Sequence, residues 1–170
     1  MKKTIITLIV ALISISGFAQ KFAFVDTEYI LSNIPAYQSA QDQLDQLSVE
    51  WQKEIEGLYG DIDKLYKDYQ AEKVLLTEEM KIKKEDEIIA KEKQAKDVQK
   101  KYFGKEGELF KKREELVKPI QDDVFNAIKE IAQEGNYDAI FDTASGASML
   151  YTNPKYDRSD EVLQKLGYKN

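Results

Sequence analysis

The chain has 170 residues, of which 33% are charged, and it contains no Cys and no His. The missing residue types exclude cysteine nucleophiles, Ser-His-Asp triads, histidine general bases, disulfides and the usual zinc ligand sets. The formal net charge of −6 does not favour binding to nucleic acid. Composition therefore favours a binding or structural protein built on long helices over an enzyme.

The first 19 residues have the three-part layout of a secretory signal peptide. Two lysines give a positive start, an apolar stretch runs from Ile5 to Ile15, and Gly17 and Ala19 occupy the −3 and −1 positions of a cleavage site. The apolar stretch is too short to span a membrane as a helix, although an uncleaved anchor is the alternative. The sequence therefore predicts export to the periplasm and a mature chain without residues 1–19.

The mature chain starts with a predicted strand. Residues 22–25 (Phe-Ala-Phe-Val) form a short apolar run that ends at Asp26, which is typical of a buried strand. A break is expected at Ile34 and Pro35, because the residue before a proline avoids the helical conformation.

From Tyr37 onward the pattern predicts a helical hairpin. Apolar residues alternate at intervals of three and four, with one stutter between Trp51 and Ile55. A turn is expected at 73–77, where Thr77 is a suitable N-cap. In the second helix, apolar residues recur every seven positions from Ile88, but the other seam position is poorly filled.

Charge supports the pairing of these two helices. Residues 37–80 carry 4 basic and 11 acidic side chains, whereas residues 81–118 carry 13 basic and 9 acidic ones. Opposite net charge favours an antiparallel hairpin arm over residues 37–118, with its tip near 73–77. Two separately solvated helical faces are the alternative.

After the arm the pattern predicts a return to mixed structure. Pro119 should kink the helix, and the apolar face that follows ends near Gly135. Residues 137–142 have the pattern of a strand. Gly146 is expected to turn the chain into a second short strand at 148–151, forming a hairpin.

A short C-terminal helix completes the predicted fold, with Ser159 as its cap and Gly167 as its stop. The fold class is α+β but mostly helical. Residues 20–36 and 119–170 would form a small β body, from which the arm projects. Three short strands make a thin core, so we expect the body to be stabilised by oligomerisation.

These elements, in this order, resemble the Skp/OmpH family of periplasmic chaperones. The matching pieces are the strand 22–26, the strand 137–142 after a Lys/Glu/Gln-rich hairpin, and residues 157–163. The last segment is similar to the family's terminal Asp-Ile-Thr-x-x-Val-Leu signature. Arg158 and Ser159 depart from it; serine should keep the capping role, while arginine should lose an apolar contact.

The resemblance implies a homotrimer in which strands from each subunit form the β body and three hairpins surround a cavity. The family holds unfolded outer membrane proteins there without ATP and delivers them for outer-membrane assembly. This implies no enzymatic activity, no cofactor and no nucleic-acid partner, and it leaves open a transient association with a membrane surface. Well-known members are basic, whereas this chain without Lys2 and Lys3 has a net charge of −8. The candidate residues of the trimer body are Phe22, Phe24, Ile140, Met149 and Leu150.

Several apolar residues of the arm lie outside the predicted seam. They either widen the packing stripe or form a wall that faces a client. The three apolar residues at the tip are harder to explain by packing, since exposed apolar clusters often bind partners. The candidate client contacts are Tyr59, Tyr66, Val74, Leu75, Leu76, Phe103 and Phe110, with Ile89 and Val117 on the same row as the two phenylalanines.

Four glycines are expected to soften the arm, and Pro119 is a further candidate hinge. Gly57 and Gly60 lie in the first helix, and Gly104 and Gly107 in the second. A glycine costs about 1 kcal/mol relative to alanine within a helix, so changing all four to alanine should raise stability. Tight helix crossings that admit no side chain are the alternative.

A structural coiled-coil spacer or adaptor of the cell envelope is the alternative function. Such a spacer would need a continuous, well-filled seam, whereas Lys91, Lys105 and Lys112 fall on the seam of the second helix. The sequence has no phosphate-binding Gly-x-x-x-x-Gly-Lys-Ser/Thr motif. The pattern therefore favours a compliant arm without nucleotide-driven activity.

Overall fold

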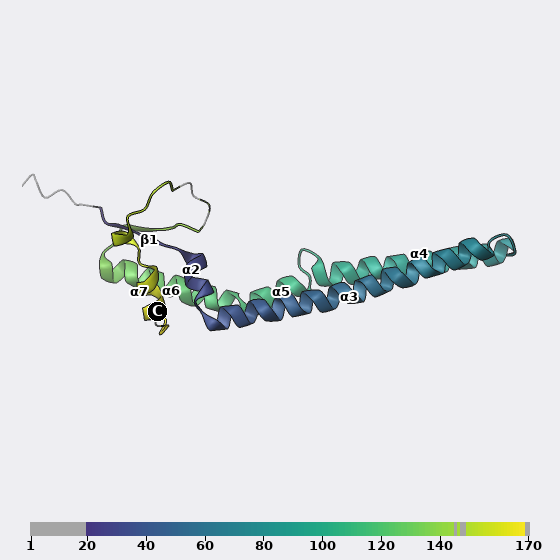
Figure 1. Cartoon of the computed structure of the whole chain (residues 1–170), viewed down its shortest axis with the longest axis horizontal. Coiled ribbons are helices and arrows are strands. Elements are labelled where there is room, and N and C mark those ends of the chain that lie inside the picture. The colour runs from purple at the N-terminus through teal and green to yellow at the C-terminus, as the bar shows by residue number, and fades with distance from the viewer. Residues whose placement is uncertain (1–19, 145, 147–148, 169–170) are drawn as a thin grey trace, which may run out of the picture. The chain divides into compact units, whose positions relative to one another are not determined.

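The computed structural model describes residues 20–144, 146 and 149–168, and Figure 1 shows the order of its elements. The predicted signal peptide lies outside the described residues. The chain divides into two compact units, one of residues 31–123 and one that combines the segments before and after it. The described residues are mostly helical and include a two-stranded sheet, which confirms the predicted fold class.

The larger unit is built on a helical hairpin. Helix α3 (Pro35–Glu72) has proline at its first position, where the missing N–H costs no hydrogen bond. After residues 73–77, helix α4 (Glu78–Phe103) is capped by Thr77, whose hydroxyl accepts a hydrogen bond from the Met80 N–H at 3.3 Å. Helix α5 (Glu108–Leu116) continues the second half, and both α4 and α5 pack against α3.

Two buried clusters hold the hairpin together. One joins Ile62 and Tyr69 of α3 to Ile88 and Ala95 of α4. The other combines Ala40, Leu44 and Val117. The burial of residues at seven-residue spacing on both helices explains why the heptad pattern predicts the pairing.

The second half of the hairpin is interrupted twice. Residues 104–107 separate α4 from α5, and a loop rises between these two helices in Figure 1. The second interruption is the single residue Val117, after which α6 (Lys118–Gly135) begins with Pro119 in its first turn. Proline is tolerated there because the first-turn N–H groups have no partner within the helix.

The smaller unit contains a parallel pair of strands. Strand β1 (Phe22–Val25) pairs with β2 (Ala139–Asp142), with Phe24 opposite Phe141. Ala23 and Val25 are buried on one face of β1, so its two phenylalanines point to the other face. The short helix α2 (Thr27–Ser32) follows, and the Asp142 carboxylate accepts hydrogen bonds from the N–H and hydroxyl of Thr27.

The described part of the predicted strand at 148–151, which is residues 149–151, does not form a strand. Gly146 does adopt a positive φ of 73°, but the described residues 149–151 are not in a strand, and Ser148 lies outside the described residues. The third position beside β1 is taken by a single parallel bridge between Phe24 and Asp157. An apolar segment forms a strand only where a neighbouring strand pairs with it. The described part of the chain provides no such neighbour for this segment.

The C-terminal helix α7 (Ser159–Lys165) follows a 3-10 turn at Pro154–Tyr156, but its cap differs from the prediction. Ser159 is the first residue of the helix, and the Asp157 carboxylate accepts from its N–H at 2.8 Å. The Ser159 hydroxyl instead accepts a hydrogen bond from the Asp26 N–H at the end of β1. Gly167 adopts a φ of 85° after the helix, as expected for a C-terminal stop.

Helix α7 is fixed to α6 by charge and burial. The Lys165 ammonium lies 3.1 Å from a Glu130 carboxylate oxygen and 2.7 Å from one of Glu134. These hydrogen bonds hold the pKa of Lys165 above its usual range. Val162 and Leu163 on the same helix are almost fully buried, so α7 contributes a large part of this unit's small core.

Candidate functional site

Two tyrosines form an exposed row on helix α3. Tyr59 and Tyr66 directly follow Leu58 and Leu65, which pack against the buried cluster around Ile62. Tyr66 is 53% exposed, and Tyr59 is also exposed. The two rings therefore flank the packed seam without being part of it.

Helix α4 carries a matching aliphatic row. Ile89 is 62% exposed and directly follows the buried Ile88, and the exposed Ile82 lies one heptad before it. Each residue of a right-handed helix is rotated by about 100° from the one before it. In two antiparallel helices, the residue after a core position therefore points to the same side of the pair. The tyrosine row and the isoleucine row consequently share one face of the hairpin.

The tip adds a second exposed apolar group. Val74 is 93% exposed and Leu75 is 86% exposed, whereas Leu76 packs against the buried cluster of the hairpin. Met80, in the first turn of α4, is exposed as well. Of the three apolar residues predicted at the tip, two are thus available to a partner and one supports the turn.

Phe103 has a structural contact that the sequence pattern did not indicate. The rings of Trp51 and Tyr102 are stacked with centroids 4.7 Å apart, and Phe103 meets Trp51 edge-on at 6.3 Å. The Tyr102 hydroxyl donates to a Glu54 carboxylate oxygen at 2.8 Å. This hydrogen bond and burial hold the pKa of Tyr102 above its usual range. We define Trp51, Tyr102 and Phe103 as the aromatic cluster.

The residues in one row with Phe103 on the second half of the hairpin differ in exposure. Phe110 on α5 is exposed, in keeping with its place among the candidate contacts. Val117 is almost fully buried with Ala40 and Leu44, so it packs within the hairpin. The seven-residue interval could not separate these positions, because the helix is interrupted between Phe103 and Phe110.

The glycines of the second half do not soften a continuous helix, contrary to the prediction. Gly104 and Gly107 bound the loop between α4 and α5. A Cβ atom on Gly104 would collide with the Lys100 carbonyl oxygen, and one on Gly107 would lie 2.7 Å from that of Tyr102. Their role is close backbone approach, which only glycine permits.

Gly57 and Gly60 have a different environment. Both lie within α3, and a Cβ atom at either position would have no neighbouring atom within 4 Å. The structure thus shows no packing reason for glycine at either position, and the softening of α3 by these two residues stays a prediction. The four candidate hinge glycines therefore fall into two chemically distinct pairs.

Polar contacts fix the two helices near the tip. The hydroxyl of Tyr69, a residue that is almost fully buried, donates a hydrogen bond to the Glu85 carboxylate of α4. This hydrogen bond raises the pKa of Tyr69 to about 12. Lys84 also forms an ion pair with Glu72. These contacts set the register of the helices that carry the exposed rows.

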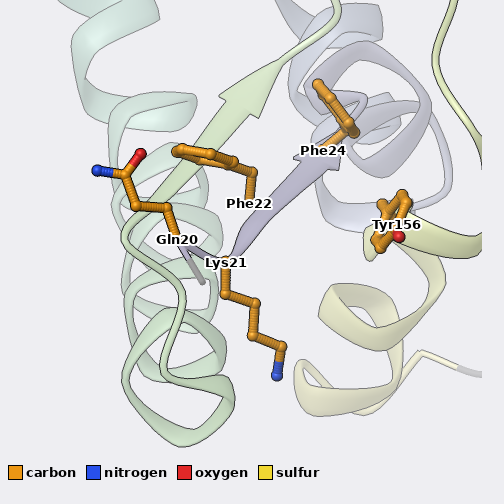
Figure 2. A pocket seen from close by; sticks show the side chains of 5 residues that line it. All are labelled: Gln20, Lys21, Phe22, Phe24 and Tyr156. Atoms are coloured by element: carbon orange, nitrogen blue, oxygen red, sulfur yellow. The ribbon is translucent and has the colours of Figure 1, made fainter. Parts of the chain in front are cut away.

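The smaller unit exposes an aromatic surface of its own. The ring centroids of Phe22 and Phe24 each lie 6.0 Å from that of Phe141 in the neighbouring strand. Phe22, Phe24 and Tyr156 line an open pocket that Gln20 and Lys21 complete (Figure 2). We call Phe22, Phe24 and Phe141 the phenylalanine face. Phe141 and Tyr156 were not among the predicted residues, although period-two alternation along 139–142 would have indicated Phe141.

The remaining predicted body residues differ in exposure. Ile140 and Met149 are half-buried, while Leu150 is fully exposed at 100% and Tyr151 is also exposed. Residues 149–151 therefore present apolar side chains to solvent within a single chain. Exposed apolar surface of this kind is typical of an interface.

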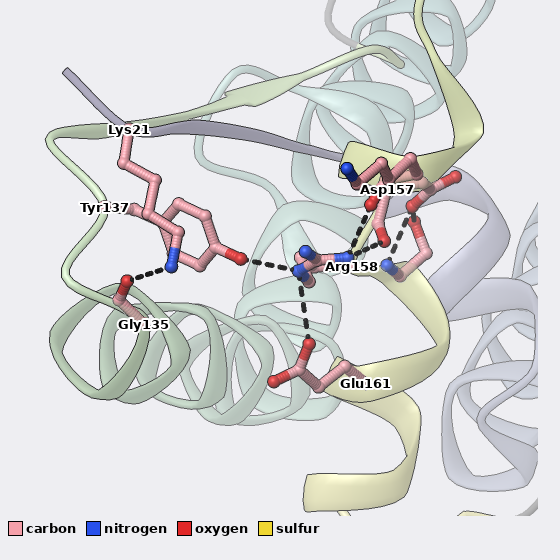
Figure 3. Close-up of polar contacts among 8 residues, drawn as sticks. Lys21, Gly135, Tyr137, Asp157, Arg158 and Glu161 are labelled. Atoms are coloured by element: carbon pink, nitrogen blue, oxygen red, sulfur yellow. Dashed lines mark hydrogen bonds and ion pairs between the residues drawn. The ribbon is translucent and has the colours of Figure 1, made fainter. Parts of the chain in front are cut away.

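The departure at Arg158 is compensated by Tyr137, as Figure 3 shows. The Arg158 Nε donates to the Tyr137 hydroxyl at 2.7 Å, and its guanidinium also lies over the ring at 5.7 Å. The Lys21 ammonium lies 4.5 Å from the centre of the same ring. Polar and cation–π contacts with Tyr137 thus join both ends of the unit.

Two further observations concern the described residues as a whole. No group of three acidic side chains in the described ranges is placed to hold a metal ion. None of the helices described combines the length and apolar character needed to cross a membrane.

A helical hairpin with an exposed apolar face, joined to a small sheet made from both chain ends, defines the class of this protein. A family model described as "Outer membrane protein (OmpH-like)" matches residues 21–166. The chain belongs to this OmpH-like family, which confirms the resemblance.

Two similar proteins were found, one by its sequence and one by its fold. An uncharacterised protein of Aquifex aeolicus (strain VF5) is 29% identical over 158 residues, which cover 93% of each chain. A crystal structure of an OmpH-like protein of Caulobacter crescentus CB15, described as a candidate outer membrane chaperone, matches with a TM-score of 0.67. That match covers 89% of this chain and 86% of the other at 12% identity, so it shows a shared fold.

Proposed function

We propose that this protein is an ATP-independent holdase chaperone of the periplasm that binds unfolded outer membrane proteins and delivers them for assembly. The observation that carries the proposal is the pair of exposed apolar rows, with Tyr59 and Tyr66 on one helix and Ile82 and Ile89 on the other. Membership of the OmpH-like family supports the same role. The proposal assigns no enzymatic activity and no cofactor.

Binding by these rows would be passive and distributed. Burial of apolar area contributes about 25 cal/mol per Å², so covering roughly 50 Å² of a half-exposed ring contributes about 1 kcal/mol. Several such contacts hold an unfolded chain, while each one breaks readily. A client can therefore leave without an energy source when its own folding buries the same residues.

We further propose a homotrimer that is held by the smaller unit. One face of the two-stranded sheet is buried, whereas its aromatic face is largely exposed, with Phe22 and Phe141 open to solvent. The phenylalanine face and the exposed residues 149–151 supply apolar surface that a neighbouring subunit would cover. Three hairpins joined at this unit would place their exposed rows around a shared client.

The direct test is suppression of aggregation. An unfolded β-barrel membrane protein is diluted from urea with and without the mature protein, and light scattering is followed over time. We expect suppression near one trimer per client and no effect of added ATP. Unchanged aggregation would contradict the holdase proposal and favour a spacer, although the interruption at 104–107 is unsuited to a rigid spacer.

A further inference from the structure

The start of β1 is clamped immediately after residue 20. The Lys21 N–H donates to an Asp138 carboxylate oxygen at 2.8 Å, and the Lys21 carbonyl accepts from the Asp138 N–H at 2.8 Å. The Lys21 ammonium also donates to the Gly135 carbonyl at 2.6 Å. Gln20 is therefore held at the edge of the smaller unit by the residue that follows it.

The side chain of Gln20 makes no polar contact with the described residues in this position. It is exposed, and within the described part of the chain its carboxamide makes no hydrogen bond or ion pair. It lies in the lining of the open pocket with Phe22, Phe24 and Tyr156 (Figure 2). Neither folding nor a polar partner protects this carboxamide from reaction.

We propose that Gln20 is a modification site and that the mature chain begins with pyroglutamate. The inference rests on the proposed export, with cleavage between Ala19 and Gln20. Cleavage makes Gln20 the N-terminal residue and releases its α-amine. This amine and the side-chain carboxamide then belong to the same residue, at the spacing that closes a five-membered lactam.

The reaction is balanced without a co-reactant. The α-amine nitrogen attacks the side-chain carbonyl carbon and forms a new C–N bond. The bond from that carbon to the amide nitrogen breaks, and the nitrogen leaves as ammonia with a proton from the attacking amine. Because amine and carbonyl are tethered, their effective concentration far exceeds that of a bimolecular reaction.

The surroundings favour the product over the free terminus. A free α-amine would be largely protonated at neutral pH and would place a positive charge at the rim of a pocket with three aromatic rings. The lactam is neutral, and its ring carbons can pack on these rings, so it avoids the cost of desolvating a charge if a subunit covers the face.

The test is the mass of the N-terminal peptide. The full 170-residue precursor is expressed in a two-membrane bacterium, purified from the periplasm and digested for mass spectrometry. We expect a peptide that starts at residue 20 and is lighter by about 17 Da, the mass of ammonia, than the unmodified peptide. It should also resist amine-reactive reagents at its N-terminus.

A start at Gln20 with a free amine would overturn the proposal, and so would a start at any other residue. The matched control is Gln20→Ser, which keeps the cleavage site but cannot cyclise. Its N-terminal peptide should have the full mass and a reactive amine. Loss of ammonia from this variant as well would place the reaction elsewhere and contradict the assignment. The aggregation assay does not depend on this result, so the two proposals fail separately.

Discussion

Tyr102 stacks on Trp51 with the two ring planes only 2° from parallel, two residues before the loop that separates α4 from α5. The stack joins the last turn of α4 to the middle of α3. It therefore holds the two helices in register up to the point where the second helix stops. The loop at 104–107 can adopt its own backbone path without loosening the outer half of the hairpin.

The first prediction concerns this stack. Replacing Trp51 by alanine should lower the free energy of unfolding by about 2–3 kcal/mol, because a large, half-buried ring with two aromatic partners is lost. Urea denaturation followed by circular dichroism measures this loss. The control is Tyr59→Ala, which removes an exposed ring of the same helix and should change stability far less. Equal losses in both variants would show that the stack has no special role.

The second prediction separates the two glycine pairs. Gly57→Ala with Gly60→Ala should stabilise the protein by roughly 1 kcal/mol per site at most, since helix propensity rises and space is open. Gly104→Ala with Gly107→Ala should destabilise it, since both Cβ atoms would collide with backbone oxygens. The midpoints of chemical denaturation should therefore move in opposite directions. A shift of both variants in one direction would refute the distinction.

The third prediction concerns alkaline pH. The pKa of Tyr69 is raised from 10.0 to about 12, so the folded state retains this proton where the unfolded state loses it. Its contribution to stability should be complete below pH 10 and decline from there toward pH 12. Unfolding measured across this range should show a steeper loss for the wild type than for Tyr69→Phe. Parallel curves would mean that the hydrogen bond to Glu85 does not couple to folding.

The fourth prediction tests the proposed trimer. Phe141→Glu places a charge in the phenylalanine face and should dissociate the oligomer, as measured by light scattering. Phe125→Glu is the matched control, because Phe125 is also exposed but lies on α6, outside the sheet. This control should leave the oligomer intact. Dissociation by both variants, or by neither, would argue against the phenylalanine face as the interface.

The fifth prediction tests the two exposed rows of the hairpin. Changing Tyr66 and Ile89 together to serine should weaken capture of an unfolded β-barrel protein several-fold, while the helices remain folded because neither side chain is buried. Val49→Ser alters an exposed apolar residue of α3 outside the two rows and serves as the control. Binding measured by fluorescence anisotropy of a labelled client distinguishes them. A loss that is equal in the control would point to general apolarity instead of a defined face.

The hairpin could be predicted from sequence because its signals are local and repeated. Heptad spacing around Ile62 and Ile88 marks the packed faces, and opposite net charge pairs the two helices. The exposed rows next to that seam follow from the same periodicity. Only the assignment of each residue to core or surface needed coordinates, as Val117 illustrates.

The loop at 104–107 was missed because the heptad runs through it unchanged, from Tyr102 to Leu109. Two glycines three residues apart were the available signal, but glycine also occurs within helices, as Gly57 does. The third strand was predicted wrongly for another reason. Apolar residues at 149–151 indicate burial, but the sequence does not say whether the covering surface belongs to the same chain.

The two strands of the sheet lie far apart along the chain, and this distance imposes an order of events. Lys21 and Asp138 are separated by 117 positions, and Asp26 and Ser159 by 133. During synthesis, which starts at the N-terminus, β1 therefore stays unpaired until nearly all of the sequence has been made. The hairpin closes earlier because its partners are close in sequence. We expect pulsed hydrogen exchange to detect protection of α3 and α4 before protection of β1. Subunit assembly would then be the last step of folding.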